Sequence, residues 1–199
     1  IVGNDALREQ VRAMASAGAG AGPSGITAHH LLPFFNDAQC LRSLAKVLTN
    51  VGNGTYSSDM RDFLLTNKGL ALDKNPGVRP IGIGDTIYRI AAGYLVGNEK
   101  DHIVEAVGEF QYGQGRPCGT EAVVHMVQEA LESATPIAVI DVDVRNAFNT
   151  RDLAHMLETM YGIPSLAPLW RLLNWKYKSP TKVLYQNRKG RIVHTVVNK

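Results

Sequence analysis

Long apolar runs and cysteine are both scarce in this 199-residue chain. No stretch approaches the roughly 18 uncharged apolar residues that a membrane-spanning helix needs, so we expect no membrane partner. The first residues include Asp5 and Glu9 and show no signal-peptide pattern. The two cysteines, Cys40 and Cys118, are far apart in sequence and have no metal-ligating neighbours, which favours reduced thiols in an intracellular protein.

Several common sites are also missing from the sequence. The six histidines form no zinc-binding pattern, and no Ser-His-Asp set of a hydrolase can be assembled from local motifs. Residues 20–25 match the letters of a G-x-G-x-x-G loop. A dinucleotide site needs a strand before those glycines and a helix starting within them, whereas here a helical pattern precedes them and Pro23 interrupts them. We therefore expect a tight turn rather than a dinucleotide site.

Acidic residues are absent from the C-terminal part of the chain. All 18 lie at or before Glu158, so residues 1–158, with 13 Lys and Arg, sum to −5, while residues 159–199 carry eight basic residues and sum to +8. Aromatic residues are interleaved with this basic stretch: Trp170, Trp175, Tyr177 and Tyr185. Such a stretch suits a polyanion, because cations pair with phosphates and aromatic rings stack on bases. A merely solvated basic surface is the alternative.

Local patterns predict an α+β fold, with helices packed on a small antiparallel sheet. Apolar spacing and capping residues predict helices near residues 5–17, 36–50, 57–67, 85–100, 100–107, 120–134 and 166–175, and a further helix capped by Asn149. Alternating runs predict a hairpin over residues 69–84, around Asn75-Pro76-Gly77, and a C-terminal β-hairpin over residues 181–197. A further, buried strand is expected over residues 137–143.

Two carboxylates end that last strand. Asp141 and Asp143 are two residues apart, so on a strand they point to the same side. Burying unpaired carboxylates is costly. Hard oxygen ligands suit Mg²⁺, which keeps waters and substrate phosphates in its shell. The alternative is structural pairing with Arg145, Arg151 or backbone donors.

The residues around Asp143 resemble a known family. The stretch DVRNAFNT, residues 143–150, resembles motif A of reverse transcriptases, above all those of non-LTR (LINE-type) retrotransposons. Three upstream stretches are similar to earlier blocks of that family, in the family's order: GPSGITAHHLLPFF, LALDKNPGVRPIGIGDTIYRIAAGYLV and QYGQGRPCGTEAVVH. Downstream, VLYQNRKGRIVHTV resembles the hairpin that precedes motif B. The resemblance implies a fragment of a right-hand polymerase, with a fingers-like region at 1–118 and the N-terminal part of the palm at 119–199.

The resemblance also implies roles for individual residues. Asp143 would bind both catalytic Mg²⁺ ions, and Val144 would offer its backbone carbonyl, whereas Asp141 aligns with a non-catalytic position. Phe148 would be the steric gate that excludes a ribose 2′-hydroxyl. Asn146 and Ala147 would line the sugar and triphosphate of the incoming dNTP.

Cations would contact the phosphates. Lys74 and Arg79 would reach from the fingers to the triphosphate; without the resemblance, a turn on a basic surface is the simpler interpretation. Along the C-terminal stretch we expect contacts with the RNA template and DNA primer from Lys182, Arg188, Lys189 and Arg191.

Two parts of the family's pattern are missing. Motif C, a Tyr/Phe-x-Asp-Asp hairpin, and motif B, with its Gln-Gly-Asp, do not occur in the sequence. Polymerisation by two metals needs those further carboxylates, so the two-ion Mg²⁺ site is expected to be incomplete and the 199-residue chain inactive. The implied parent is a nuclear RNA-directed DNA polymerase that copies retrotransposon RNA.

Two other functions stay open. One is a non-catalytic RNA- or DNA-binding module derived from a degenerate retroelement, and the other is an unrelated metal-dependent phosphotransfer enzyme. A truncated palm would also leave an open sheet edge, through which the chain could self-associate.

Overall fold

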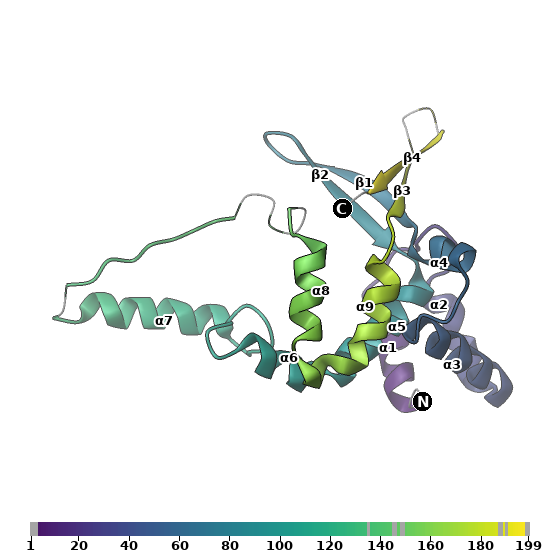
Figure 1. Cartoon of the computed structure of the whole chain (residues 1–199), viewed down its shortest axis with the longest axis horizontal. Helices are drawn as coiled ribbons and strands as arrows, with labels where there is room; N and C mark the ends of the chain where they lie inside the picture. Colours follow the sequence, from purple (N-terminus) through teal and green to yellow (C-terminus); the bar gives the residue numbers. More distant parts are fainter. Residues whose placement is uncertain are drawn as a thin grey trace. The chain divides into compact units, whose positions relative to one another are not determined.

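The computed structural model describes residues 4–134, 136–144, 147, 150–186, 189 and 191–197. The chain has the α+β fold expected from the sequence (Figure 1). It forms two compact units. Unit 1 combines Ile1–Asn98 with Ala167–Lys199, and unit 2 comprises Glu99–Leu166. Within the described residues no helix is both long and apolar enough to cross a membrane.

Five helices of unit 1, α1, α3, α4, α5 and α9, lie within a few residues of the predicted ranges, whereas α2 and η1 were not predicted. Asp37 caps α3 by accepting a hydrogen bond from the Cys40 backbone N–H at 2.7 Å, and the Ser57 side chain caps α4. Residues four apart share one helix face, and Leu7 and Val11 of α1 are both fully buried. The bounds are α1 Asn4–Ser16, α2 Ala28–Leu31, η1 Leu32–Asn36, α3 Ala38–Gly52, α4 Ser58–Leu65, α5 Thr86–Asn98 and α9 Ala167–Tyr177.

These helices enclose the main hydrophobic core. Its buried members come from all of them, and they include Leu44, Leu48, Leu64, Ile90 and Leu172. Burial of this apolar surface is the main stabilising contribution to unit 1.

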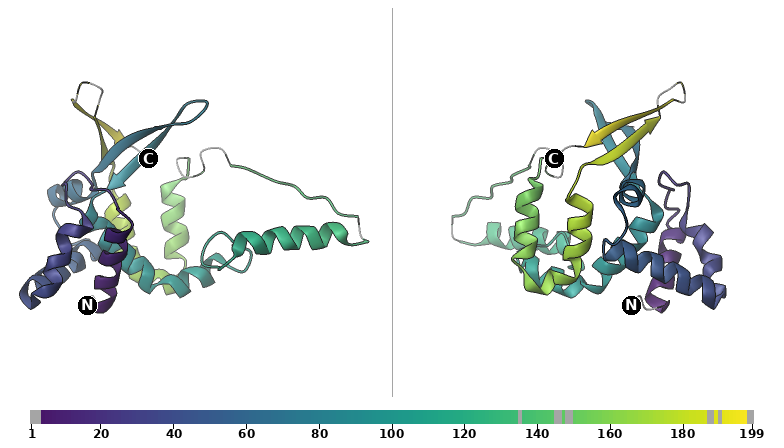
Figure 2. Two further views of the ribbon diagram at one scale, coloured as in Figure 1. Left: turned by 180° about the vertical axis from the view of Figure 1, so that it is seen from behind. Right: turned by 45° about the vertical axis from the view of Figure 1, so that its right-hand side comes forward.

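A four-stranded sheet lies at one end of these helices (Figure 2). The strands are β1 Asn67–Asp73, β2 Val78–Gly84, β3 Thr181–Gln186 and β4 Ile192–Val197, in the order β2-β1-β3-β4. Both predicted hairpins are present as antiparallel pairs. The two central strands, however, run parallel, with Asn67 opposite Val183, so the sheet is mixed and the expectation of a purely antiparallel sheet is wrong.

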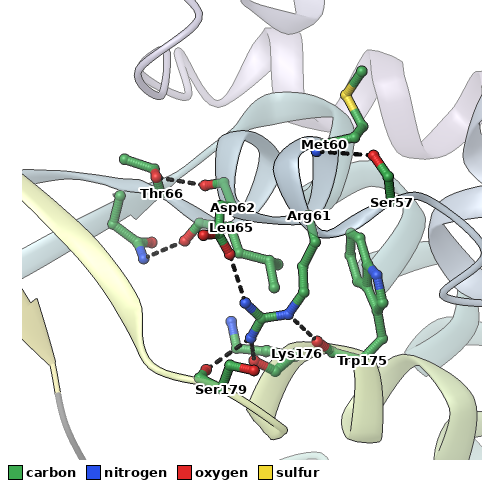
Figure 3. A network of polar contacts seen from close by, with 10 residues as sticks. Ser57, Met60, Arg61, Asp62, Leu65, Thr66, Trp175, Lys176 and Ser179 are labelled. Atoms are coloured by element: carbon green, nitrogen blue, oxygen red, sulfur yellow. Dashed lines mark hydrogen bonds and ion pairs between the residues drawn. The ribbon is translucent and has the colours of Figure 1, made fainter.

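A buried arginine accounts for the parallel pair. Arg61 of α4 is 2% exposed, and its guanidinium donates to the main-chain carbonyls of Trp175 at 2.6 Å, Lys176 at 2.8 Å and Ser179 at 2.7 Å (Figure 3). The end of α9 is thereby held against α4. Because β1 follows α4 directly and β3 follows α9 directly, both strands start from this point and extend in the same direction. Arg61 also pairs with Asp62 at 2.8 Å.

Unit 2 contains three helices and a 3-10 turn among the described residues: α6 Lys100–Val107, α7 Gly119–Glu132, α8 Leu153–Tyr161 and η2 Pro164–Leu166. The expected cap of α8 is wrong. The helix begins at Leu153, and the Asp152 side chain caps it by accepting from the His155 N–H at 3.1 Å. Asn149, the cap expected from the sequence, lies outside the described residues.

The strand expected over residues 137–143 is not formed. Residues 136–144 run without regular secondary structure and are exposed, with Ile140 at 83% and Val142 at 76% (Figure 1). A strand requires hydrogen bonds to a neighbouring strand, and none of the strands in the described part of the chain pairs with this segment. The apolar run alone therefore misled the prediction.

Candidate nucleic-acid interface

The tip of the β1–β2 hairpin carries two of the predicted phosphate-binding residues. The ladder ends at the pair Asp73–Val78, Arg79 lies opposite Leu72 one position inside, and Lys74 follows in the turn, where its N–H donates to the Gly77 carbonyl at 2.9 Å. Both cations are exposed. The hairpin thus brings Lys74 and Arg79 to the same end of the sheet. Asp73 precedes Lys74 in the sequence, but it forms an ion pair with neither cation among the described residues.

A groove of about 640 Å³ lies between residues 21–25 and strands β1, β3 and β4. The polar residues of its lining are Lys68, Tyr185 and Gln186, and the other lining residues are apolar or glycine. Gly69 makes room for the aromatic ring, because a Cβ on this residue would overlap the ring of Tyr185. Lys68 pairs with Leu184 and Gly69 pairs with Tyr185, so the exposed lysine and the aromatic ring project to opposite faces of the sheet. A single-stranded nucleic acid in the groove would therefore meet the lysine without the ring beside it.

The glycine-rich wall of this groove is fixed to the start of α5. The buried Asp85 carboxylate accepts from the backbone N–H groups of Ser24 at 3.3 Å and Ile87 at 3.1 Å, and the Thr86 hydroxyl donates to the Ile26 carbonyl at 2.5 Å. A Cβ on Gly22 would lie 2.5 Å from the Asp85 Cα, so only glycine allows this close approach. The sequence indicated a tight turn here and Asp85 as a helix start, but it gave no sign that the two meet.

The C-terminal hairpin provides the other predicted nucleic-acid contacts. Lys182 is exposed on β3, opposite Val196 of β4. Lys189 and Arg191 are exposed in the connection between β3 and β4. Arg188 lies outside the described residues. The exposed cations of this hairpin belong to the same sheet as the groove.

The aromatic residues of the basic stretch do not form one stacking surface. Trp175 is 2% exposed and belongs to the hydrophobic core, and burial raises the pKa of the Tyr177 phenol. Lys176 lies 4.4 Å from the ring centroid of Tyr88, a cation–π contact within unit 1. Of the aromatic residues that the sequence singled out, Tyr185 is the one that lines the groove.

The predicted catalytic segment lies in unit 2. Asp143, Val144 and Ala147 are exposed, whereas Asn146 and Phe148 lie outside the described residues. Asp143 and the Val144 carbonyl offer oxygen donors of the type that Mg²⁺ prefers. Among the described residues no group of three or more carboxylate, histidine or cysteine side chains is placed to hold a metal. These donors therefore do not complete a metal site by themselves, and the role of Asp143 stays a prediction.

Comparison with known proteins gives a distant relationship. The chain is 25% identical, over 180 residues, to a protein named "Retrotransposable element SLACS 132 kDa protein" from Trypanosoma brucei gambiense. The match covers 89% of this chain but 15% of that protein, so the chain spans less than a sixth of its relative. No family model and no solved structure matches the chain.

Proposed function

We propose that the chain is the fingers and N-terminal palm of a retroelement RNA-directed DNA polymerase. The observation that carries this proposal is the similarity to a retrotransposable-element protein over 89% of the chain, which supports a retroelement-derived origin. Reverse transcription itself rests on the motif A resemblance at Asp143 and the ordered blocks before it.

The groove supports a role in holding nucleic acid. Lys68 is exposed and lines the groove, so it would contact a phosphate of a single-stranded RNA that lies there. At the hairpin tip, Lys74 and Arg79 would contact the triphosphate of the incoming dNTP. The sequence-based roles of Asn146, Ala147 and Phe148 around that nucleotide belong to the same proposal.

Activity is tested in the full-length parent polypeptide with primed RNA, dNTPs and Mg²⁺. Asp143→Asn is expected to abolish templated primer extension, because asparagine cannot supply the negative charge that a bound metal needs. Asp141→Asn is the matched control from the same segment, and it should keep most of the activity. Equal activity in the two variants would remove Asp143 from the catalytic role.

The 199-residue chain alone should give no templated extension, because the carboxylates of motif C are missing from it. Extension by this chain would contradict the proposal that it holds only part of the active site.

A non-catalytic nucleic-acid-binding module is the second candidate, favoured by the basic hairpin and the groove. It predicts RNA binding by the chain, with no extension by the parent in any condition. Substitution of Lys182, Lys189 or Arg191 by alanine should then weaken binding similarly for all RNA sequences, and each lost phosphate contact should reduce the salt slope by about 0.7. The coding sequence downstream of residue 199 separates the candidates. A Tyr/Phe-x-Asp-Asp motif there supports the polymerase, and an early stop codon supports the binding module.

A further inference from the structure

A second concave site, separate from the groove, lies on the helices of unit 1. It has a volume of about 410 Å³ and is formed by α1, α2 and η1. Arg8 and Arg12 come from α1, His29 from α2 and Asn36 from η1, and apolar residues of η1 complete the lining. No carboxylate lines this site.

The Arg8 guanidinium is held in place. It donates to the Phe35 main-chain carbonyl at 3.0 Å, and its central carbon lies 5.5 Å from the centroid of the Phe35 ring, which is itself buried. This bond uses one of the five N–H groups of the guanidinium. An arginine fixed in this way loses little further rotamer freedom when an anion binds to its remaining N–H groups.

Neither arginine of the site forms an ion pair within the described part of the chain. Asp5 and Glu9 precede Arg8 and Arg12 by three residues on α1, but neither forms an ion pair with them. The two arginines are four residues apart, a spacing that places them on one helix face about 5–6 Å apart and makes them repel each other. A bound anion would relieve that repulsion.

We propose that this site binds a phosphate group. Arg12, which is exposed, would provide a bidentate contact, the free N–H groups of Arg8 would provide a second, and His29 and Asn36 would add single hydrogen bonds. The phosphate is carried either by a small molecule or by the backbone of a single-stranded RNA, and the second source rests on the function proposed above. The volume exceeds that of one phosphate ion, which leaves space for an attached sugar against the apolar lining.

The first test uses inorganic phosphate, titrated at constant ionic strength into the ¹⁵N-labelled 199-residue chain, with the arginine Nε–H signals followed by NMR. We expect saturable chemical-shift changes of the Arg8 and Arg12 signals. In Arg12→Gln, the phosphate affinity reported by the Arg8 signal should fall at least tenfold. Arg42→Gln, which removes an exposed arginine of α3 bonded to Gln39 at 2.9 Å, should behave like the wild type. Arg12 is the preferred position because removing Arg8 also breaks the bond to Phe35. Absent or non-saturable shifts, or equal affinity in Arg12→Gln and the wild type, would overturn the proposal.

The second test identifies the source of the phosphate. If RNA carries it, Arg12→Gln should lower the salt slope of binding to a 20-nucleotide single-stranded RNA by about 0.7 relative to Arg42→Gln, and free phosphate should compete. An unchanged slope, with inorganic phosphate still bound through Arg12, assigns the site to a small phosphate compound. If no variant binds RNA, the nucleic-acid function fails, whereas the phosphate titration still decides this site on its own.

Discussion

Replacing Arg61 with alanine should destabilise unit 1 more than any surface substitution. The Arg61 side chain is 2% exposed and donates three hydrogen bonds, of 2.6 to 2.8 Å, to main-chain carbonyls. Two of these carbonyls belong to the last turn of α9, and the third belongs to Ser179, just after the helix. Hydrogen bonds to a charged group contribute about 1.5–3 kcal/mol each, so three set a ceiling of roughly 5–9 kcal/mol. After truncation of Arg61 to alanine, water can hydrogen-bond to the carbonyl of the exposed Ser179, which offsets part of the cost. We therefore expect a loss of about 3–5 kcal/mol in the free energy of unfolding.

Urea unfolding followed by tryptophan fluorescence measures this loss, because Trp175 is buried beside the guanidinium. Arg61→Lys should recover only a small part of the loss, since a single ammonium cannot reach three carbonyls with the fixed fork of a guanidinium. Arg42→Ala, at an exposed arginine, should stay within about 0.5 kcal/mol of the wild type. An Arg61→Ala variant less than about 1 kcal/mol below the wild type would refute the argument that this arginine holds α9 against α4.

Three further predictions concern smaller features. Asp37→Ala should lower the melting temperature by removing the α3 cap, while Asp37→Ser, which can still cap, should lower it less. The hydrogen bond of the cap lowers the pKa of Asp37, so its stabilising effect is present above the unfolded-state pKa and is lost as the pH falls through the folded-state pKa. Gly69→Ala should destabilise the sheet by displacing the Tyr185 ring, and in a double-mutant cycle Tyr185→Ala should remove part of that cost; strictly additive losses would contradict the close packing. The Glu99 carboxylate, 2.8 Å from His102, raises the pKa of that histidine above 6.5. The pair therefore stabilises unit 2 fully below the unfolded-state pKa of His102, and the effect is lost as the pH rises through its folded-state pKa. Glu99→Gln should lower the His102 pKa in an NMR titration, and an unchanged pKa would disprove the pairing.

Features decided by neighbouring residues were predictable from the sequence. Both hairpins follow from local turn chemistry, and the structure confirms them. The starts of α3 and α4 each offer two suitable capping residues, Asn36 or Asp37 and Ser57 or Ser58, and the structure selects Asp37 and Ser57. The cap of α8 was placed wrongly because Asn149 and Asp152 are both suitable capping residues, and their types alone do not select one.

Features decided by distant residues were not predictable. Trp175 looked like a stacking residue of a basic surface, but Arg61, 114 residues earlier, and the helical core bury it. The segment that contains Asp143 has the composition of a buried strand, yet a strand also requires a partner, which composition does not reveal. The groove likewise depends on the approach of Gly22 to Asp85, and no local pattern records that approach.

The pairing of β1 with β3 has a consequence for biosynthesis. Unit 1 is discontinuous, since all of residues 99–166 are synthesised between its two parts. A ribosome that has released residues 1–98 has therefore exposed a helical core still lacking α9 and a sheet still lacking two strands. That intermediate carries unpaired β1 backbone groups and uncovered apolar side chains, so the nascent chain should depend on chaperones until residues 167–199 emerge.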